Sequence, residues 1–306
     1  MNIGVLCVLT FVGAVALRDV FFAGFFQQFD FFQVVLLATA LTVLSFGIAL
    51  FVKRGQWTAL LAARREAFFS ALGTACAWLC YLSALKLLEP AVVNAIHTGT
   101  GAIVLLAMGA LRLNVARPAH YTRLELALWS GVLVTLLLLS AVVLVGYSGL
   151  ADRSLTQNLR GLGFAFASGI FIAPASDIAK RMNEKGMNAA SVLAVRQVGT
   201  MLVAAAMVGF AAPTGMTLTA PDTLLRVGVA SALLMALPLY LLQQGLARTS
   251  ALSIWVVQAL GPCLIFAVQL TDGRLNPSAW TLACLASFSV LAIAANLARK
   301  FERAAA

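Results

Sequence analysis

Long apolar stretches follow one another along almost the whole of this chain of 306 residues. About 20 apolar residues are enough to cross a hydrocarbon core of about 30 Å as a helix. The sequence therefore predicts an all-α integral membrane protein with ten transmembrane helices. We place them at about 2–24, 31–52, 66–88, 90–111, 123–149, 157–179, 187–211, 224–247, 250–271 and 276–298.

The composition excludes other classes of protein. With 62% hydrophobic and 10% charged residues, the chain has too little polar surface to coat a soluble globule. The runs are continuous, unlike the alternating segments of an outer-membrane barrel, and the short connections leave no room for a soluble catalytic module. Arg18 and Asp19 stand where a signal-peptide cleavage site would be expected, so we expect a retained first helix.

The formal net charge of +10 is distributed unevenly between alternate connections. With the N-terminus in the cytoplasm, fourteen basic residues lie inside: Lys53, Arg54, Arg64, Arg65, Arg112, Arg117, Arg123, Lys180, Arg181, Lys185, Arg248, Arg299, Lys300 and Arg303. Six lie outside: Arg18, Lys86, Arg153, Arg160, Arg226 and Arg274. This bias predicts a protein of the inner cell membrane with both termini cytoplasmic. No basic cluster with interleaved aromatic residues favours a nucleic-acid partner.

Metal and nucleotide sites are not indicated. The five cysteines lie inside apolar runs, where they read as small core residues. Cys76 and Cys80 share a helix face, but no third or fourth metal ligand accompanies them. No P-loop is present, so we expect no cofactor and no ATP hydrolysis by this polypeptide.

The two halves of the chain resemble each other weakly. Ser70-Ala71-Leu72 recurs as Ser231-Ala232-Leu233, and Asp19 and Gly101 correspond to Asp177 and Gly261. The spacing of the helices agrees as well, which predicts one five-helix repeat over residues 1–154 and a second over 155–306. Because five is odd, the second half enters the membrane in the opposite sense, as an inverted-topology repeat.

Two segments carry a resemblance to a known family. Tyr240-Leu-Leu-Gln-Gln-Gly-Leu-Ala-Arg-Thr-Ser-Ala251, followed by Ala259-Leu-Gly-Pro262, and the first-half segment Tyr81-Leu-Ser-Ala-Leu-Lys-Leu-Leu-Glu-Pro-Ala91 are similar to the late helix pairs of the drug/metabolite transporter superfamily, in its ten-helix EamA-like branch. Arg196 matches an arginine common there. The resemblance implies a transporter of small organic molecules such as amino acids, their analogues or drugs, often exported.

The chain also departs from the family's pattern. Gly101-Ala102 stands where the first half usually has a proline, and Ala38 where a second arginine would be. The first helix lacks the glutamate that the small four-helix members use for proton exchange. The mechanism that couples transport to a driving force therefore stays open between proton and substrate antiport.

Polar side chains at membrane depth are the candidates for a substrate site. In the fourth span Asn94, His97, Thr98 and Gly101 lie three and four residues apart, hence on one helix face. The equivalent face of the ninth span carries Trp255 and Gln258, and the third and eighth spans add Trp78, Tyr81, Tyr240 and Gln243. Ordinary packing or an interfacial aromatic belt is the competing interpretation. His97 would either carry a coupling proton or hydrogen-bond the cargo, unless it is a core histidine.

Four charged residues within spans need a separate explanation. Asp19 and Asp177 occupy equivalent repeat positions, which makes them candidates for gating or coupling, with helix termination as the alternative. Arg18 is expected to extend to the interface. For Arg196 we expect a structural role, in an ion pair with Asp177 or in bonds to carbonyls, and capture of an anionic substrate group is the alternative.

These features favour a secondary transporter that moves a small organic metabolite by alternating access, with export as the expected direction. The partners expected are a small-molecule substrate and membrane lipid, with monomer and dimer left open. A membrane-embedded enzyme or lipid-modifying protein is the rival class, but no catalytic motif such as His-Glu-x-x-His is present. The cavity candidates suit a zwitterionic or moderately polar molecule better than a polyanion.

Overall fold

The computed structural model describes residues 3–111, 122–149, 154–210, 212–213, 215–249, 251–271, 273 and 276–305. His120 and four basic residues of the predicted charge bias, Arg112, Arg117, Arg153 and Arg274, lie outside this part of the chain. Within it, nine helical segments are long and apolar enough to cross a membrane. The prediction of an all-helical fold is therefore confirmed for these residues, and the nine segments agree in length and composition with a multi-pass membrane protein.

The nine long segments are α1 (Ile3–Gln28), α2 (Phe31–Val52), α4 (Arg64–Leu87), α5 (Pro90–Ala110), α6 (Arg123–Leu144), α7 (Leu155–Glu184), α8 (Ala189–Phe210), a composite of α9 (Pro221–Ser231), η1 (Ala232–Ala236) and α10 (Leu237–Arg248), and α13 (Ala279–Ala305). Three shorter helices complete the described part of the chain: α3 (Gln56–Ala62), α11 (Ala251–Gln258) and α12 (Gly261–Gln269).

Several helices begin at polar residues that cap them. The Asp30 side chain accepts a hydrogen bond from the backbone N–H of Gln33, and Ser154 with Gln157 forms a reciprocal capping box before α7. Such caps satisfy backbone donors that the first turn of a helix leaves without partners. They explain why α2 and α7 begin close to where the apolar runs begin.

The ninth predicted span, 250–271, is not one continuous helix. It breaks at Ala259–Leu260 into α11 and α12. Pro262 follows directly and has no N–H to donate to the carbonyl of Gln258, against which its ring would also clash. The break leaves backbone at membrane depth, where it is tolerated only inside the protein.

The eighth span is continuous but irregular. A π-helical segment, η1, separates α9 from α10, and the N–H of Leu237 bonds to the carbonyl of Ala232 five residues back. Pro238 follows in the first turn of α10. The wider turn accommodates the proline without ending the helix.

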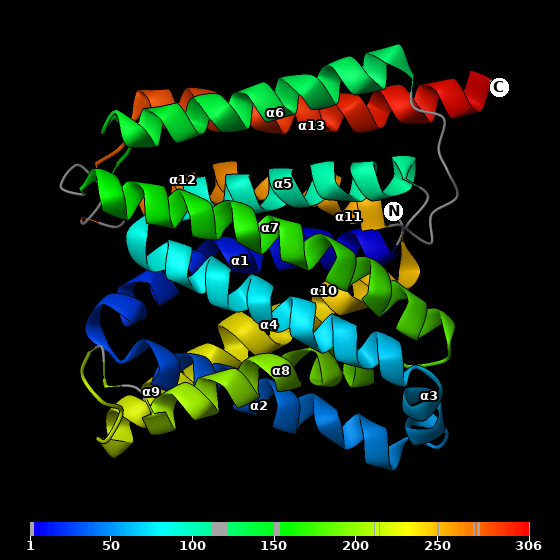
Figure 1. Ribbon diagram of the computed structural model, residues 1–306, viewed down its shortest axis with the longest axis vertical. Coiled ribbons are helices and arrows are strands. Elements are labelled where there is room, and N and C mark those ends of the chain that lie inside the picture. The colour runs from blue at the N-terminus through cyan, green and yellow to red at the C-terminus, as the bar shows by residue number, and fades with distance from the viewer. Residues whose placement is uncertain are drawn as a thin grey trace.

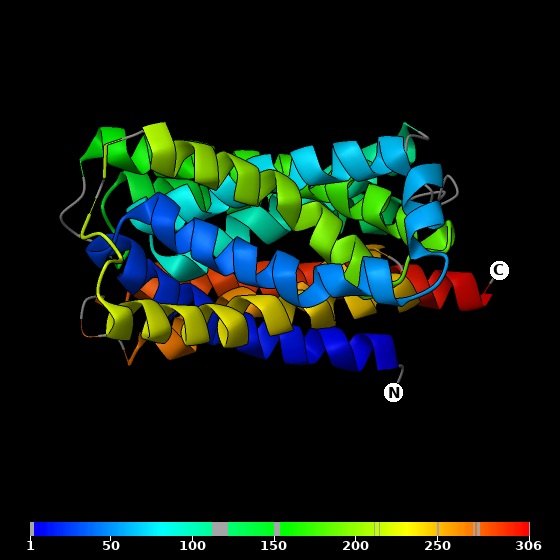
Figure 2. The same ribbon diagram turned by 90° about the horizontal axis from the view of Figure 1, so that it is seen from below.

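The long helices lie side by side in one bundle (Figures 1 and 2). In Figure 1, α6 and α13 form one edge, α2, α8 and α9 form the opposite edge, and α1, α4, α5, α7 and α10 lie between them. α1 begins at the end of the bundle where α13 finishes, and the connections from α1 to α2, from α4 to α5 and from α6 to α7 lie at the other end.

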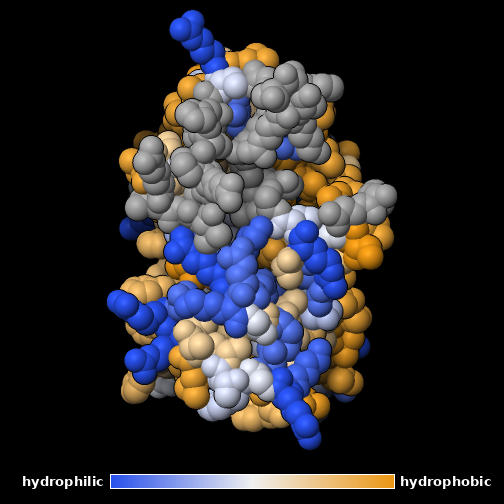
Figure 3. Space-filling view, turned by 90° about the vertical axis from the view of Figure 1, so that its right-hand side faces the viewer, coloured by the Kyte–Doolittle hydropathy of each residue, from blue (hydrophilic) through white to orange (hydrophobic). Residues whose placement is uncertain are grey.

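Hydrophilic side chains gather at the end where α1 begins, which faces the viewer in Figure 3. Nine of the basic residues in the described part of the chain belong to this end: Lys53, Arg54, Arg64, Arg65, Arg123, Lys180, Arg181, Lys185 and Arg248. Three belong to the opposite end: Lys86, Arg160 and Arg226. The bias inferred from the sequence thus separates the two ends of the bundle.

Close approach of α7 to α5 depends on Gly169. A Cβ atom at this position would lie 2.7 Å from the backbone carbonyl oxygen of His97 and 2.6 Å from Cβ of Thr100. Small residues at such crossings let helix backbones approach closely in membranes. The contact fixes the position of His97 relative to α7.

Candidate functional site

A cavity of about 70 Å³ lies in the middle of the bundle, between α1, α4, α5, α7, α8, α10, α11 and the first residue of α12. A cavity needs about 10–15 Å³ on this measure to hold one water molecule. The space is therefore large enough for several waters or a small organic molecule. Helices from both halves of the chain contribute to its wall.

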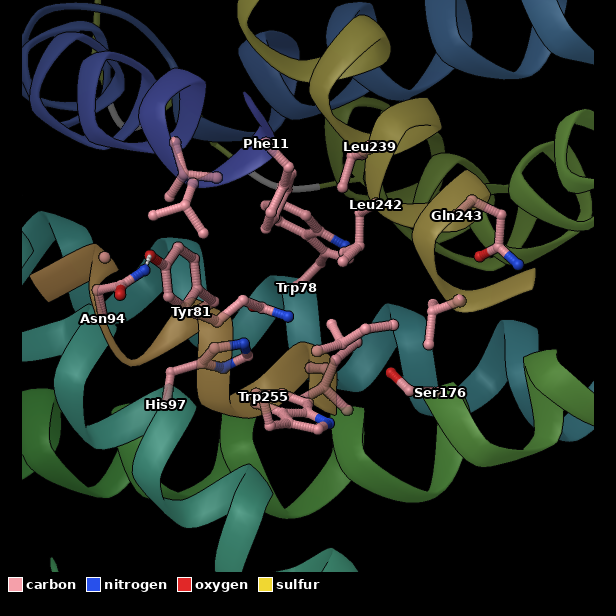
Figure 4. A pocket seen from close by; sticks show the side chains of 18 of the residues that line it. Phe11, Trp78, Tyr81, Asn94, His97, Ser176, Leu239, Leu242, Gln243 and Trp255 are labelled. Carbon is pink, nitrogen blue, oxygen red and sulfur yellow. Dashed lines mark hydrogen bonds between the residues drawn. The ribbon is translucent and has the colours of Figure 1, made fainter. Parts of the chain in front are cut away.

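The lining combines aliphatic side chains with polar and aromatic ones. The polar and aromatic residues are Phe11, Arg18, Trp78, Tyr81, Asn94, His97, Ser176, Arg196, Gln197, Gln243, Trp255 and Gln258. In Figure 4, Asn94 and Tyr81 lie on one side and Gln243 on the other, with Trp78 and Trp255 between them. An apolar pocket with a few placed polar groups is the usual form of a small-molecule site.

Most of the substrate-site candidates from the sequence meet in this cavity. Asn94, His97, Trp78, Tyr81, Gln243, Trp255 and Gln258 all line it. Thr98 is buried but does not line the cavity. Tyr240 also lies outside it, stacked on Phe46 of α2 at 4.9 Å between ring centroids and accepting a hydrogen bond from Gln244.

Gly101, the last residue of the predicted stripe, has a packing role. A Cβ at this position would lie 2.6 Å from the indole ring of Trp255. The missing side chain lets Trp255 pack against α5, which couples the fourth span to the broken ninth. Gly261, which the sequence comparison of the halves paired with Gly101, lies against Asn94, whose Oδ1 would be 2.9 Å from a Cβ there.

A hydrogen-bonded network surrounds Asp19 on one side of the cavity. Arg18 pairs with Asp19 at 2.7 Å, and the hydroxyl of Tyr81 donates to the same carboxylate. Asn94 Nδ2 lies 3.1 Å from the Tyr81 hydroxyl and 3.4 Å from Asp19 Oδ2. The Arg18 guanidinium also lies over the ring of Trp78, 5.0 Å from its centroid. Asp19 is thus enclosed by donors.

The expectation that Arg18 reaches the interface is wrong. Its side chain is buried, 4% exposed, and lines the cavity. α1 continues to Gln28, ten residues beyond Arg18, so the helix end is about 15 Å further along the axis. At that depth the Arg18 guanidinium has Asp19 as its partner in place of water.

His97 is held by a serine of α7. Its Nδ1 lies 2.9 Å from Ser168 Oγ, and this hydroxyl donates its single hydrogen to the Ala165 carbonyl at 2.6 Å. Ser168 must therefore accept from His97, which assigns the imidazole proton to Nδ1 and leaves Nε2 as an acceptor. This arrangement is the reverse of a serine activated by a histidine base.

Arg196 does not pair with Asp177. Its Nε donates to Thr74 Oγ1 and its Nη1 to Gln243 Oε1, each at 3.1 Å. Asp177 pairs instead with Arg181 at 2.9 Å, one turn further along α7. The two acids that the sequence comparison of the halves paired therefore differ. Asp19 belongs to the hydrogen-bonded network beside the cavity, whereas Asp177 pairs with Arg181 on its own helix.

Sequence reasoning missed three polar residues of the cavity, Arg18, Ser176 and Gln197, and favoured a structural role for Arg196, with capture of an anionic substrate group as the alternative. The available signal was a charged or amide side chain within an apolar span. Gln197 is 1% exposed and its Oε1 has no hydrogen-bond partner among the described residues. Arg196 and Gln197, which are adjacent on α8, thus both line the cavity.

Searches for similar sequences gave no relative: no protein-family model matches the chain, and no curated protein does. The structure is similar to a solved one described as "Crystal structure of protein", with a TM-score of 0.67 and 20% identity over 98% of this chain and 97% of the other. At that identity the likeness concerns the fold alone. It covers the whole helical bundle.

Proposed function

We propose that the protein is a secondary transporter that exports a small organic metabolite across the inner membrane by alternating access, as in the drug/metabolite transporter superfamily. The observation that carries the proposal is the central cavity, which lies between helices of both halves and is lined by a few polar groups. Polar side chains placed inside an apolar bundle typically mark a substrate pathway.

The pattern of helix packing supports two inverted five-helix halves. Exchanging the halves turns the contact between α4 and α7 into that between α1 and α10, and the contact between α5 and α7 into that between α1 and α12; all four contacts occur. The same exchange turns the contact between α2 and α8 into itself, and likewise the contact between α6 and α13. Both of these contacts also occur. α1 and the equivalent α7 run in opposite directions (Figure 1).

Broken helices at the cavity further support transport. The interruption between α11 and α12 lies beside Gln258 and Gly261, which both line the cavity. Transporters of inverted-repeat construction bind cargo near the bilayer midplane at discontinuous helices. The accumulation of basic residues at one end of the bundle supports a cytoplasmic location for that end and for both termini.

The transport proposal is tested in proteoliposomes holding the full chain. Uptake of labelled amino acids and organic acids is measured with and without a proton gradient, and saturable uptake of at least one solute is expected. Asn94→Ala and His97→Gln should lower the affinity for that solute, whereas Tyr240→Phe, outside the cavity, should not. Uptake equal to that of empty vesicles across the panel would refute the proposal.

Orientation is tested by labelling single cysteines introduced into a cysteine-free background. Positions near Arg65 and Lys185 should react only with reagent on the cytoplasmic side, and positions near Tyr147 and Ser278 only with reagent outside. The opposite pattern would overturn the assignment of the two ends.

A further inference from the structure

Arg196 is a buried cation that neutral groups hold in place. Arg196 is only 6% exposed. Its guanidinium donates hydrogen bonds to the Thr74 hydroxyl and to the Gln243 amide oxygen. Within the described part of the chain, no carboxylate oxygen lies within 4.0 Å of its guanidinium. A guanidinium has five N–H donors, so these two acceptors orient the group without neutralising it.

Gln243 provides a second donor at the same place. Because a guanidinium only donates, the amide oxygen of Gln243 must face Arg196. The amide nitrogen is then a donor that Arg196 does not use. This Nε2 atom is buried and has no hydrogen-bond partner among the residues that the structure describes. Gln243 is 1% exposed and lines the cavity together with Arg196.

The charges that line the cavity leave one positive charge uncompensated. Arg18 is neutralised by Asp19 at 2.7 Å, whereas Arg196 has no such partner in the described residues. A ligand with one negative charge would complete the balance, and a second negative charge would be buried without a partner. A carboxylate accepts hydrogen bonds at two oxygens, which suits donors from a guanidinium and an amide.

The rest of the cavity specifies the body of the ligand. Leu193, Leu239, Leu242 and Trp255 line it, and Figure 4 shows Leu239 and Leu242 between Gln243 and Trp78. A volume of about 70 Å³ with such walls favours a small apolar or aromatic group. Tyr81 and Asn94, which belong to the polar network around Asp19, lie on the far side of Trp78 from Gln243 (Figure 4).

We infer that the cargo is an organic monocarboxylate with an apolar body, and that Arg196 and Gln243 receive its carboxylate. This inference rests on the proposed transport function and specifies the class of substrate. It assigns Arg196 to recognition of the cargo. The structural role expected from the sequence is then limited to the hydrogen bonds that Arg196 donates to Thr74 and Gln243.

The test compares each acid with its primary amide, which has nearly the same shape and no charge. The probes are 3-phenylpropanoate with 3-phenylpropanamide and 4-methylpentanoate with 4-methylpentanamide, together with the dianion benzylmalonate. Binding to the purified full chain is followed by tryptophan fluorescence, since Trp78 and Trp255 line the cavity, and by thermal stabilisation. We expect each acid to bind about 10- to 100-fold more tightly than its amide, and benzylmalonate to bind more weakly than 3-phenylpropanoate.

Two cavity variants and one control separate charge from folding. Arg196→Gln should abolish the preference for acids. Gln243→Glu should do the same by placing a carboxylate beside Arg196, and it keeps the test decisive where Arg196→Gln does not fold. Arg160→Gln removes an exposed positive charge near the start of α7, outside the cavity, and should keep the preference.

Equal affinity for acids and amides, or binding of no acid at all, overturns the inference, as does a preference for acids that persists in both cavity variants. Stabilisation by chloride without discrimination between acids and amides would assign the charge to an inorganic anion and also overturns it. These outcomes differ from a failure of the transport proposal. Proteoliposomes that carry an uncharged solute would support transport and leave only the substrate class refuted.

Discussion

Two arginines line opposite parts of one cavity, and they differ in what neutralises them. Arg18 and Arg196 are similarly buried, at 4% and 6% exposure. Arg18 pairs with Asp19 and lies over Trp78, whereas Arg196 meets only the neutral oxygens of Thr74 and Gln243 among the described residues. The two arginines therefore differ in role although they are similarly buried. The difference comes from whether a carboxylate lies beside the guanidinium.

The largest effect is expected from Asp19→Asn. The substitution leaves Arg18 buried without its carboxylate, a change that typically costs about 3–5 kcal/mol of unfolding free energy. Unfolding of the purified variant in detergent measures the loss, and adding Arg18→Gln in the same chain should recover most of it. Asp177→Asn is the control, because its partner Arg181 has a side chain 38% exposed, and the loss should be about 1 kcal/mol. Equal losses at the two acids would remove the distinction.

Tyr81→Phe should have the next largest effect. Its hydroxyl donates to the buried carboxylate of Asp19, and a hydrogen bond to a charged group is worth about 1.5–3 kcal/mol. Tyr240→Phe is the matched control, since that hydroxyl accepts from the neutral amide of Gln244, and it should cost about 1 kcal/mol. A larger loss at Tyr240 would show that the network around Asp19 is not what stabilises this side of the cavity.

Arg196→Gln should change stability least among these cavity variants, by about 1 kcal/mol or less, because two lost hydrogen bonds are offset by removal of a buried charge without a carboxylate. The same unfolding experiment in detergent gives the value. A loss as large as that of Asp19→Asn would restore the structural role that the sequence favours for Arg196. The comparison between the two arginines would then fail.

A buried acid outside the cavity, Glu89, extends the comparison to the pH dependence of stability. Glu89 is 1% exposed and accepts from the N–H of Gly149, at 2.9 Å, and from Gln269. Burial raises the pKa of Glu89 above its ordinary value of 4.5, and these two hydrogen bonds oppose the rise. A raised pKa means that the folded state binds the proton more tightly than the unfolded state.

The stability contributed by protonated Glu89 is therefore complete below pH 4.5 and is lost as pH rises through its raised pKa. In Glu89→Gln this part of the pH dependence should disappear, as followed by thermal unfolding in detergent from acidic to neutral pH. Asp222→Asn, an exposed acid in the first turn of α9, should leave the profile unchanged. An unaltered profile in Glu89→Gln would assign the pH dependence to other groups.

The helices could be predicted closely because apolar length alone defines them. The span expected at 31–52 coincides with α2 (Phe31–Val52), and the span expected at 90–111 ends one residue beyond α5. The break at Ala259–Leu260 was not predicted, because the residues on both sides are apolar and a proline inside a span predicts a kink as readily as an interruption. The short α3 lies in a connection, where no apolar period indicates it.

The cavity could be predicted in part. Helical spacing placed Asn94 and His97 on one face correctly, but Thr98 is only one residue further and points about 100° away around the helix. Tyr240 and Gln243 share a helix face broadly, and only the packing of α10 against α1 and α8, with Tyr240 stacked on Phe46, decides which of them meets the cavity. The periodicity of the sequence shows which residues share a helix face, but it does not show which other helices that face contacts.

The sequence by itself determined that this protein is a bundle of apolar helices with most of its basic residues at one end, because length, hydropathy and charge act locally along the chain. Only the tertiary structure decided which buried charges are neutralised. Arg196 meets Thr74 and Gln243 from two other helices, 122 and 47 residues away in the chain. Such contacts depend on how each helix is rotated against its neighbours, and in an apolar bundle that rotation is set by side-chain packing over the whole molecule.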